Sequence, residues 1–190
     1  MKYFISCILL VLVSACTNHF DYSDLAVNLT NIDNKIDRKC TAVLDDAFSK
    51  YTWVQSNGLD TWNYQLGGTL NKQLTTMCNN VFTNCTIKEQ SSDFNKDETN
   101  LILIPRVLYV SETSGARGWS DATTEIKIEW TIKNKNNDLL FLQEIEGDAT
   151  SKIGGWDQAE LRKGRLTNAI NNLFNKTQDK LIATRSLLED

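Results

Sequence analysis

Pairs of carboxylates are the residues of this 190-residue chain whose spacing suits general acid–base chemistry. Two neighbouring carboxyl groups can serve as acid and base when their surroundings drive the two pKa values apart. The pairs that a carboxylate-based hydrolase would use are Asp45 with Asp46, Asp97 with Glu98, and Glu144 with Glu146. The residues around them are typical of solvent-exposed strand faces and charged loops. We therefore predict no catalytic residue and a protein that is not an enzyme.

Nucleophilic and metal chemistry has few residues to use. The chain holds one histidine, His19, and lacks the Gly-x-Ser-x-Gly, Gly-x-x-x-x-Gly-Lys-Ser/Thr and His-Glu-x-x-His motifs. Asp93, Asp97 and Glu98 lack the glycine and glutamate of a calcium loop. We predict no metal site and no cofactor. The net charge of −4 also argues against a nucleic-acid partner, because no excess of basic residues is present.

The first fifteen residues have the order of a secretion signal. Lys2 is followed by a mostly apolar run, residues 4–13, and then by small residues. A run of this length is too short for the bilayer core, which needs roughly 20 residues, but it suits the apolar region of a signal peptide. We predict that residues 1–15 are a signal peptide. Its removal takes away Lys2 and no acid, so the mature chain is one unit more acidic than the full chain.

The segment Val13-Ser14-Ala15-Cys16 resembles a bacterial lipobox. The resemblance implies cleavage before Cys16, which then carries a thioether-linked diacylglycerol and an acylated amine such as a palmitoyl amide. Several acyl chains anchor a protein stably, since each buried methylene contributes about 0.8 kcal/mol. Thr17 stands where inner-membrane lipoproteins carry aspartate, which implies an outer-membrane protein whose domain lies in the periplasm or at the cell surface. The alternative is an ordinary signal peptide and a plain Cys16 thiol.

Three cysteines remain once Cys7 leaves with the signal and Cys16 is acylated. They are Cys40, Cys78 and Cys85. Outside the cytoplasm a disulfide is expected, and three cysteines allow at most one bridge within the chain. We predict Cys78–Cys85, because Cys85 follows the end of a predicted helix that carries Cys78. The alternative is that Cys78 is a small buried thiol on the apolar face of that helix.

Residues 16–39 are predicted to be a lipidated polar stalk. Within it Leu25, Leu29, Ile32 and Ile36 recur at helical spacing, so we expect a short helix. This helix would dock on its own domain or, alternatively, on a partner or the membrane surface.

The predicted folded domain covers residues 40–183 and is followed by a tail, residues 184–190. Strict alternation of apolar and polar residues makes 122–133 the clearest strand, and apolar stripes mark two amphipathic helices. Pro105 requires an edge or a bulge within its strand. The expected elements are a strand or helical turn at 40–48, a hairpin-like segment at 51–65, a helix opening at 67–69 with Thr69 as a candidate N-cap, strands at 84–90, 101–111, 122–133 and 139–147, a glycine-bearing loop at 112–120 and a helix at 157–183.

This order predicts a two-layer α+β sandwich. A largely antiparallel sheet of four to five strands would bury one face under the two helices. The order resembles that of small Gram-negative periplasmic and outer-membrane lipoproteins, of the lipopolysaccharide-assembly and lipid-transport-auxiliary types. That resemblance carries no functional residue other than Cys16.

Five tryptophans are the one compositional oddity, and Trp130 faces the predicted core. The other four fall in or beside loops and are either an interaction surface or lids over sheet edges: Trp53, Trp62, Trp119 and Trp156. Together these features predict a non-catalytic, lipid-anchored assembly or accessory subunit with a protein partner in the envelope. The alternative is a lipid- or glycan-binding module with an apolar cavity between helices and sheet.

Overall fold

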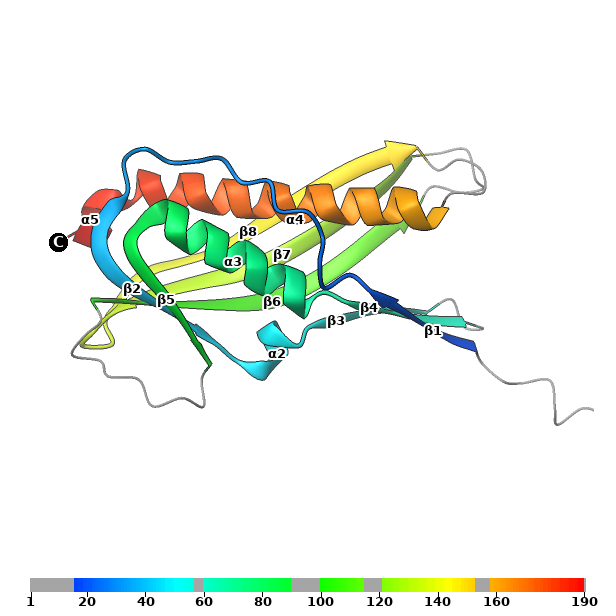
Figure 1. Cartoon of the computed structure of the whole chain (residues 1–190), viewed down its shortest axis with the longest axis horizontal. Helices are drawn as coiled ribbons and strands as arrows, with labels where there is room; N and C mark the ends of the chain where they lie inside the picture. The colour runs from blue at the N-terminus through cyan, green and yellow to red at the C-terminus, as the bar shows by residue number, and fades with distance from the viewer. Residues whose placement is uncertain (1–15, 57–59, 90–99, 115–120, 153–157, 190) are drawn as a thin grey trace, which may run out of the picture.

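Two β-sheets and two long helices make up the protein, and the fold class is the predicted α+β (Figure 1). The computed structural model describes residues 16–56, 60–89, 100–114, 121–152 and 158–189. No helix among these residues combines the length and apolar character that crossing a membrane requires.

The larger sheet has five strands in the order β5-β2-β6-β7-β8. The three strands β6, β7 and β8 form the predicted antiparallel meander, whereas β2 runs parallel to both β5 and β6. The sheet is therefore mixed rather than largely antiparallel. The strands are β2 (Ile36–Leu44), β5 (Phe82–Glu89), β6 (Leu101–Ser114), β7 (Asp121–Asn134) and β8 (Leu139–Lys152).

Pro105 is tolerated inside this sheet because β6 has a full-length neighbour on one side only. The parallel ladder between β2 and β6 joins Cys40–Ala42 to Leu101–Leu103 and ends before Pro105. The antiparallel ladder to β7 continues past it, with a bulge between Val107 and Tyr109. Pro105, which lacks an N–H donor, therefore has no partner strand on the β2 side and lies close to a bulge on the β7 side, as predicted.

Helices α3 (Gly67–Val81) and α4 (Gln158–Ala183) cover one face of the larger sheet (Figure 1). Their predicted apolar stripes are confirmed, because the stripe residues of both helices are buried. Trp130 of β7 is fully buried and meets the edge of Phe174 on α4, with ring centroids 5.5 Å apart. Short helix α5 (Arg185–Glu189) follows α4 and buries Leu188.

The interior between the helices and the larger sheet is filled with side chains. Its largest fully buried members include Trp130, Phe82, Phe174, Leu70, Leu74, Met77 and Ile126. Gly147 lets α4 approach β8 closely, since a Cβ there would collide with the backbone of Ala169 and Leu173. These buried side chains occupy the place between helices and sheet where the alternative prediction puts an apolar ligand cavity.

The smaller sheet has three strands in the order β1-β4-β3. Strands β3 (Thr52–Ser56) and β4 (Asp60–Gln65) are antiparallel and form the hairpin predicted at 51–65. Short helix α2 (Asp46–Ser49) joins β2 to this hairpin, so the segment 40–48 holds both a strand and a helical turn. Strand β1 (Cys16–Asp21) runs parallel to β4 and was not predicted.

A buried ion cluster joins the two sheets. Glu112 of β6 accepts hydrogen bonds at both carboxylate oxygens from Arg162 of α4, with N–O distances of 3.0–3.2 Å. Arg165, one turn further along α4, approaches the same carboxylate at 3.2 Å and donates to Ser151 of β8. Arg162 also donates to the hydroxyl of Tyr64 in β4. One carboxylate thus holds α4, β8 and the smaller sheet against β6.

The structure contains the predicted Cys78–Cys85 disulfide, which ties α3 to β5. Cys40 lies opposite Cys85 on the neighbouring strand β2, and the three Sγ atoms lie within 4.8 Å of one another. Cys40 is free and buried. Burial raises the pKa of its thiol far above the usual range, so it stays protonated and a poor nucleophile at neutral pH.

Substitution of Glu112 by glutamine is expected to destabilise the protein strongly. The side chains of Glu112 and Arg165 are only 4% and 5% exposed, so the variant leaves buried guanidinium groups without their counter-charge. Loss of one partner from such a pair costs about 3–5 kcal/mol, measurable as a lower urea midpoint. The control is Glu129→Gln, whose partner Arg106 is mostly exposed and whose loss costs about 1 kcal/mol or less. Equal midpoints for the two variants would contradict this role of Glu112.

Cys40 is expected to resist alkylation until the protein unfolds. Native protein treated with iodoacetamide at about pH 7.5 should yield an unmodified tryptic peptide spanning Cys40–Lys50, in which Cys40 is the single cysteine. The same peptide should become fully modified in about 6 M guanidinium, because unfolding removes the burial that disfavours the thiolate. Alkylation of the native protein at the unfolded rate would show that the thiol is accessible.

Candidate functional site

The residue predicted to carry lipid, Cys16, opens strand β1 and lies opposite Asp60 of β4. The ladder continues without interruption to Asp21, opposite Gln65. The predicted anchor residue is therefore paired into a sheet from the first residue of the described chain, and no free stalk separates it from the domain.

Aromatic rings hold β1 against the rest of the protein. Phe20 of β1 stacks on Tyr64 of β4 at 5.1 Å between ring centroids, and Trp53 of β3 stacks on the same tyrosine at 4.8 Å. Tyr22, just after β1, lies 5.5 Å from Tyr64. Burial raises the pKa of Tyr64, so its phenol stays neutral while it accepts the hydrogen bond from Arg162. Tyr64 thus links the anchor strand to the ion cluster.

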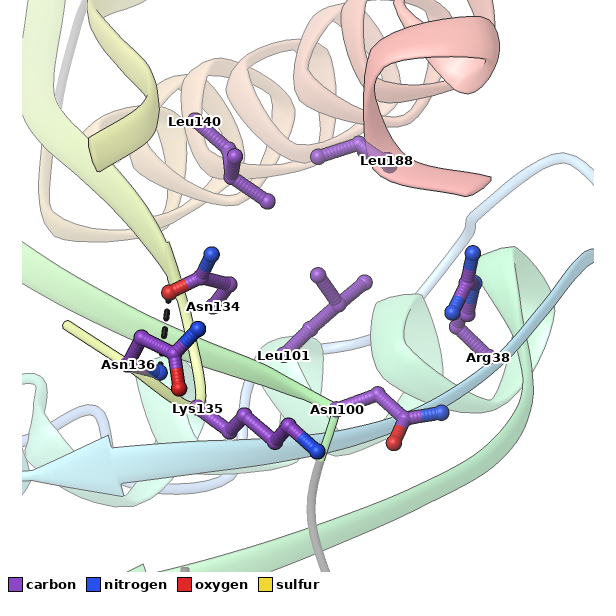
Figure 2. Close-up of a pocket in the computed structure, with 8 residues that line it drawn as sticks. All are labelled: Arg38, Asn100, Leu101, Asn134, Lys135, Asn136, Leu140 and Leu188. Atoms are coloured by element: carbon purple, nitrogen blue, oxygen red, sulfur yellow. Dashed lines mark hydrogen bonds between the residues drawn. The ribbon is translucent and has the colours of Figure 1, made fainter. Parts of the chain in front are cut away.

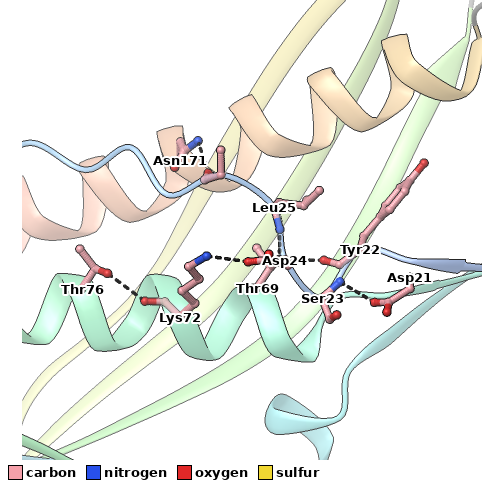
Figure 3. A network of polar contacts seen from close by, with 10 residues as sticks. Asp21, Tyr22, Ser23, Asp24, Leu25, Thr69, Lys72, Thr76 and Asn171 are labelled. Carbon is pink, nitrogen blue, oxygen red and sulfur yellow. Dashed lines mark hydrogen bonds and ion pairs between the residues drawn. The ribbon is translucent and has the colours of Figure 1, made fainter.

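After β1 the chain turns and becomes the strap, which we define as residues 22–35. Figure 3 shows how α3 holds its start: the Thr69 hydroxyl donates to the carbonyl of Tyr22 at 2.7 Å and accepts from the N–H of Leu25 at 2.9 Å. Asp24 pairs with Lys72 at 2.6 Å. Thr69 was predicted to cap its own helix, but α3 begins two residues earlier and the hydroxyl binds the strap instead.

Two asparagines on α4 bind the backbone of the strap in the same way. Asn171 accepts from the N–H of Asn28 at 2.9 Å and donates to the carbonyl of Ala26 at 3.2 Å. Asn175, one helical turn later, accepts from the N–H of Thr30 at 2.9 Å and donates to the carbonyl of Asn28 at 3.2 Å. Asparagines one helical turn apart on α4 therefore bind strap residues that are two positions apart. All four hydrogen bonds go to backbone groups of the strap and none to its side chains.

The last part of this contact comes from both helices. Gln178 of α4 and Asn80 of α3 each donate to the carbonyl of Thr30, at 3.0 and 3.2 Å. The strap then runs on to β2 along the outer side of the helices (Figure 1). The amides of α3 and α4 thus supply the hydrogen bonds that hold the strap in place.

The helix predicted from Leu25, Leu29, Ile32 and Ile36 does not form. The strap contains neither helix nor strand, and Ile36 belongs to β2. The side-chain amides of asparagine and glutamine on α3 and α4 form hydrogen bonds with N–H and carbonyl groups of the strap. In a helix these backbone groups would have bonded to one another. Leu25 is nevertheless buried, and Leu29 and Ile32 pack against the core, so the apolar positions dock on the domain as one of the two alternatives expected.

Of the four tryptophans predicted as an interaction surface, Trp53 and Trp62 lie among the described residues. Trp53 is only 6% exposed, because the hairpin turns it onto Tyr64, so it belongs to the core. Trp62 is half-buried on the same sheet. Trp119 and Trp156 lie outside the described residues.

The predicted carboxylate pairs have structural partners where they are described. Asp45 caps α2 by accepting from the N–H of Phe48, and Asp46 pairs with exposed Lys50. Glu146 accepts from the Tyr109 hydroxyl at 2.7 Å, and this hydrogen bond is the main reason its pKa is lowered. Glu144 lies 3.9 Å from Lys127, which also pairs with Glu146. Asp93, Asp97 and Glu98 lie outside the described residues.

Substitution of Asn175 by alanine is expected to loosen the strap without unfolding the domain. The variant loses both hydrogen bonds to the strap, each worth about 1 kcal/mol, so native-state exchange of the Thr30 amide should rise roughly thirtyfold. The matched control is Asn172→Ala on the same helix, whose amide donates to Asp148 of β8 instead. Equal acceleration in both variants would mean that the asparagine contacts do not hold the strap.

Comparison with known proteins finds similar structures but no match by sequence. No family model and no curated protein matches the chain. A Xanthomonas campestris protein of family-model DUF330 is similar in structure, with a TM-score of 0.58 and 7% identity over 89% of this chain and 97% of that one. A minor lipoprotein from Acinetobacter baumannii aligns with a TM-score of 0.47 and 10% identity over 80% of this chain and 96% of that one. Uncharacterized lipoprotein B from Nitrosomonas europaea aligns with a TM-score of 0.35 and 13% identity over 87% of this chain and 89% of that one. Both alignments are too weak to support an argument. The likeness to the Xanthomonas protein establishes the fold alone.

Proposed function

We propose that this chain is a non-catalytic, lipid-anchored protein of the bacterial cell envelope. The observation that carries the proposal is the lipobox-like segment that ends at Cys16, the residue at which strand β1 begins. Processing before Cys16 would leave the whole of β1 in the mature protein. Delivery to the outer membrane, with the domain in the periplasm or at the cell surface, follows from Thr17 within the same resemblance.

The proposed anchor sets the orientation of the domain. Cys16 begins β1 at one end of the long axis of the molecule, and α5 lies at the opposite end (Figure 1). β1 is held by β4 and by aromatic stacking, so the acyl chains connect to the domain without a flexible linker. The smaller sheet would then lie beside the bilayer, and α5 with the β7–β8 turn would project away from it.

The proposed role is that of an assembly or accessory subunit with an envelope protein as partner. Of the four large apolar side chains that are most exposed among the described residues, two lie at the end that would project from the membrane: Leu139 of β8 is 56% and Leu187 of α5 is 57% exposed. Aliphatic side chains left in water favour contact with another protein surface. The carboxylates that a hydrolase would use serve as a cap and as ion-pair partners where they are described, which supports a non-catalytic role.

Metabolic labelling with an alkyne analogue of palmitate tests the anchor. Wild-type protein expressed in a Gram-negative host should be labelled and found with the membranes, because acylation attaches it there. Cys16→Ser should stay unlabelled and appear in the aqueous fraction. The control is Cys7→Ser, which changes a cysteine within the predicted signal and should leave labelling intact. Unlabelled wild-type protein in the aqueous fraction would exclude the lipid anchor.

A further inference from the structure

A polar cavity of about 270 Å³ opens at the end of the molecule that carries α5. Figure 2 shows its walls: Arg38 comes from β2, Asn100 directly precedes β6, and Lys135 and Asn136 come from the turn between β7 and β8. These segments are distant in the sequence and converge only in the fold. The cavity lies apart from the strap and from Cys16, so it is independent of the proposed anchor.

The cavity is electropositive although the protein as a whole is acidic. Arg38 and Lys135 both line it, and no acidic residue is among its described lining residues. Neither of these two side chains forms an ion pair with any residue that the structure describes. Arg38 does act at longer range on Glu189, whose pKa is lowered mainly by its hydrogen bond from Arg185 and in smaller part by Arg38. Two positive charges still line the same small space with no acid among the described lining residues, and this excess of positive charge favours binding of an anion.

Two acids that lie beside lining residues in the chain, Glu189 and Asp138, have hydrogen-bond partners of their own. The Glu189 carboxylate accepts from Arg185 at 2.7 Å and from the N–H of Asp37 at 3.1 Å. Asp138 accepts from the side chain of Asn134 at 2.9 Å. Both carboxylates thus have hydrogen-bond partners outside the cavity lining or within the turn, and Arg38 interacts with Glu189 only at a distance beyond an ion pair.

The turn that presents Lys135 and Asn136 is preformed. The side-chain oxygen of Asn134 accepts from the N–H groups of Asn136 and Asp138, both at 2.9 Å, and Asn137 takes the left-handed conformation at φ 71°. The side-chain amides of Asn100 and Asn136 make no hydrogen bond with other described residues. They remain available as donors beside the two cations, held on a backbone that binding need not rearrange.

The opposite wall is apolar. Leu140 and Leu188 line it, and Figure 2 shows them facing each other across from the polar side chains, with Leu101 pointing toward them from beside Asn100. The volume is small for a ligand site, since such pockets usually measure about 300–1,000 Å³. It suits a charged head group with a short organic skeleton rather than a long chain.

We propose that this cavity binds the phosphate group of a phosphate monoester, such as a phosphorylated sugar. A monoester dianion matches the two cationic charges, and the planar guanidinium of Arg38 suits two-point contact with phosphate oxygens. The free amides of Asn100 and Asn136 supply further donors for phosphate or hydroxyl oxygens. The leucine wall receives the carbon skeleton. The same head group occurs on soluble sugar phosphates and on phospholipids, so the source is a separate question.

Calorimetric titration of full-length protein in uncharged detergent with α-glucose 1-phosphate tests the site. Saturable one-to-one binding is expected. Arg38→Gln and Lys135→Gln should each weaken it about tenfold, the effect of losing one charge-assisted hydrogen bond. The control is Lys163→Gln, which removes the same charge from an exposed part of α4 away from the cavity. Unchanged thermal unfolding midpoints would show that the variants fold.

Two further arms decide the chemistry and the source. Glucose should not bind, and glucuronate should bind at least about tenfold more weakly than glucose 1-phosphate, since its carboxylate carries a single charge. Micelles doped with phosphatidic acid are then tested for competition with glucose 1-phosphate. Competition identifies a lipid head group as the source of the phosphate, and lack of competition identifies a soluble ester. Both results support the phosphate site. Absence of saturable binding, equal affinity for glucuronate, or equal affinity of the two variants and wild type would overturn the proposal.

Discussion

The fold depends on one carboxylate, Glu112, buried between two arginines. Arg162 takes both of its oxygens, Arg165 adds a second positive charge, and each arginine reaches a different partner beyond it. Because burying charges is costly, the cluster is stable only when α4, β6, β8 and the smaller sheet are all in place. It therefore makes the relative position of the two sheets part of the native state.

Tyr64 extends this constraint to the predicted anchor. Its hydroxyl completes the coordination of Arg162, and its ring is the surface on which Phe20 and Trp53 stack. The strap then continues from β1 along α4, where the side chains of Asn171 and Asn175 bind its backbone. The segment predicted as a stalk is thus bound at both ends to elements that the ion cluster positions. Movement of Cys16 relative to the domain would require breaking contacts in two places.

Local periodicity predicted the elements, and long-range pairing explains what it missed. The alternation along residues 122–133 and the stripes of α3 and α4 depend on neighbouring residues, so the sequence alone was sufficient to find them. Strand β1 depends on a parallel partner more than forty positions away, and the strap depends on amides of α4 that look like ordinary surface residues. Glu112 was assigned to a loop, because a charge at a strand end gives no sign that two arginines will bury it.

The same reasoning explains why the cavity was not predicted. Arg38, Asn100 and Lys135 look like solvent-exposed residues at the ends of three separate elements, and only the topology brings them together. Strands β2 and β6 are parallel, so both begin at the same end of the sheet. Strand β7 is antiparallel to β6 and ends where β6 begins, so the β7–β8 turn lies at that same end. The anchor strand belongs to the other sheet, at the far end of the long axis (Figure 1). If Cys16 carries the proposed lipid anchor, a ligand in the cavity would therefore lie at the end of the domain that is remote from the membrane.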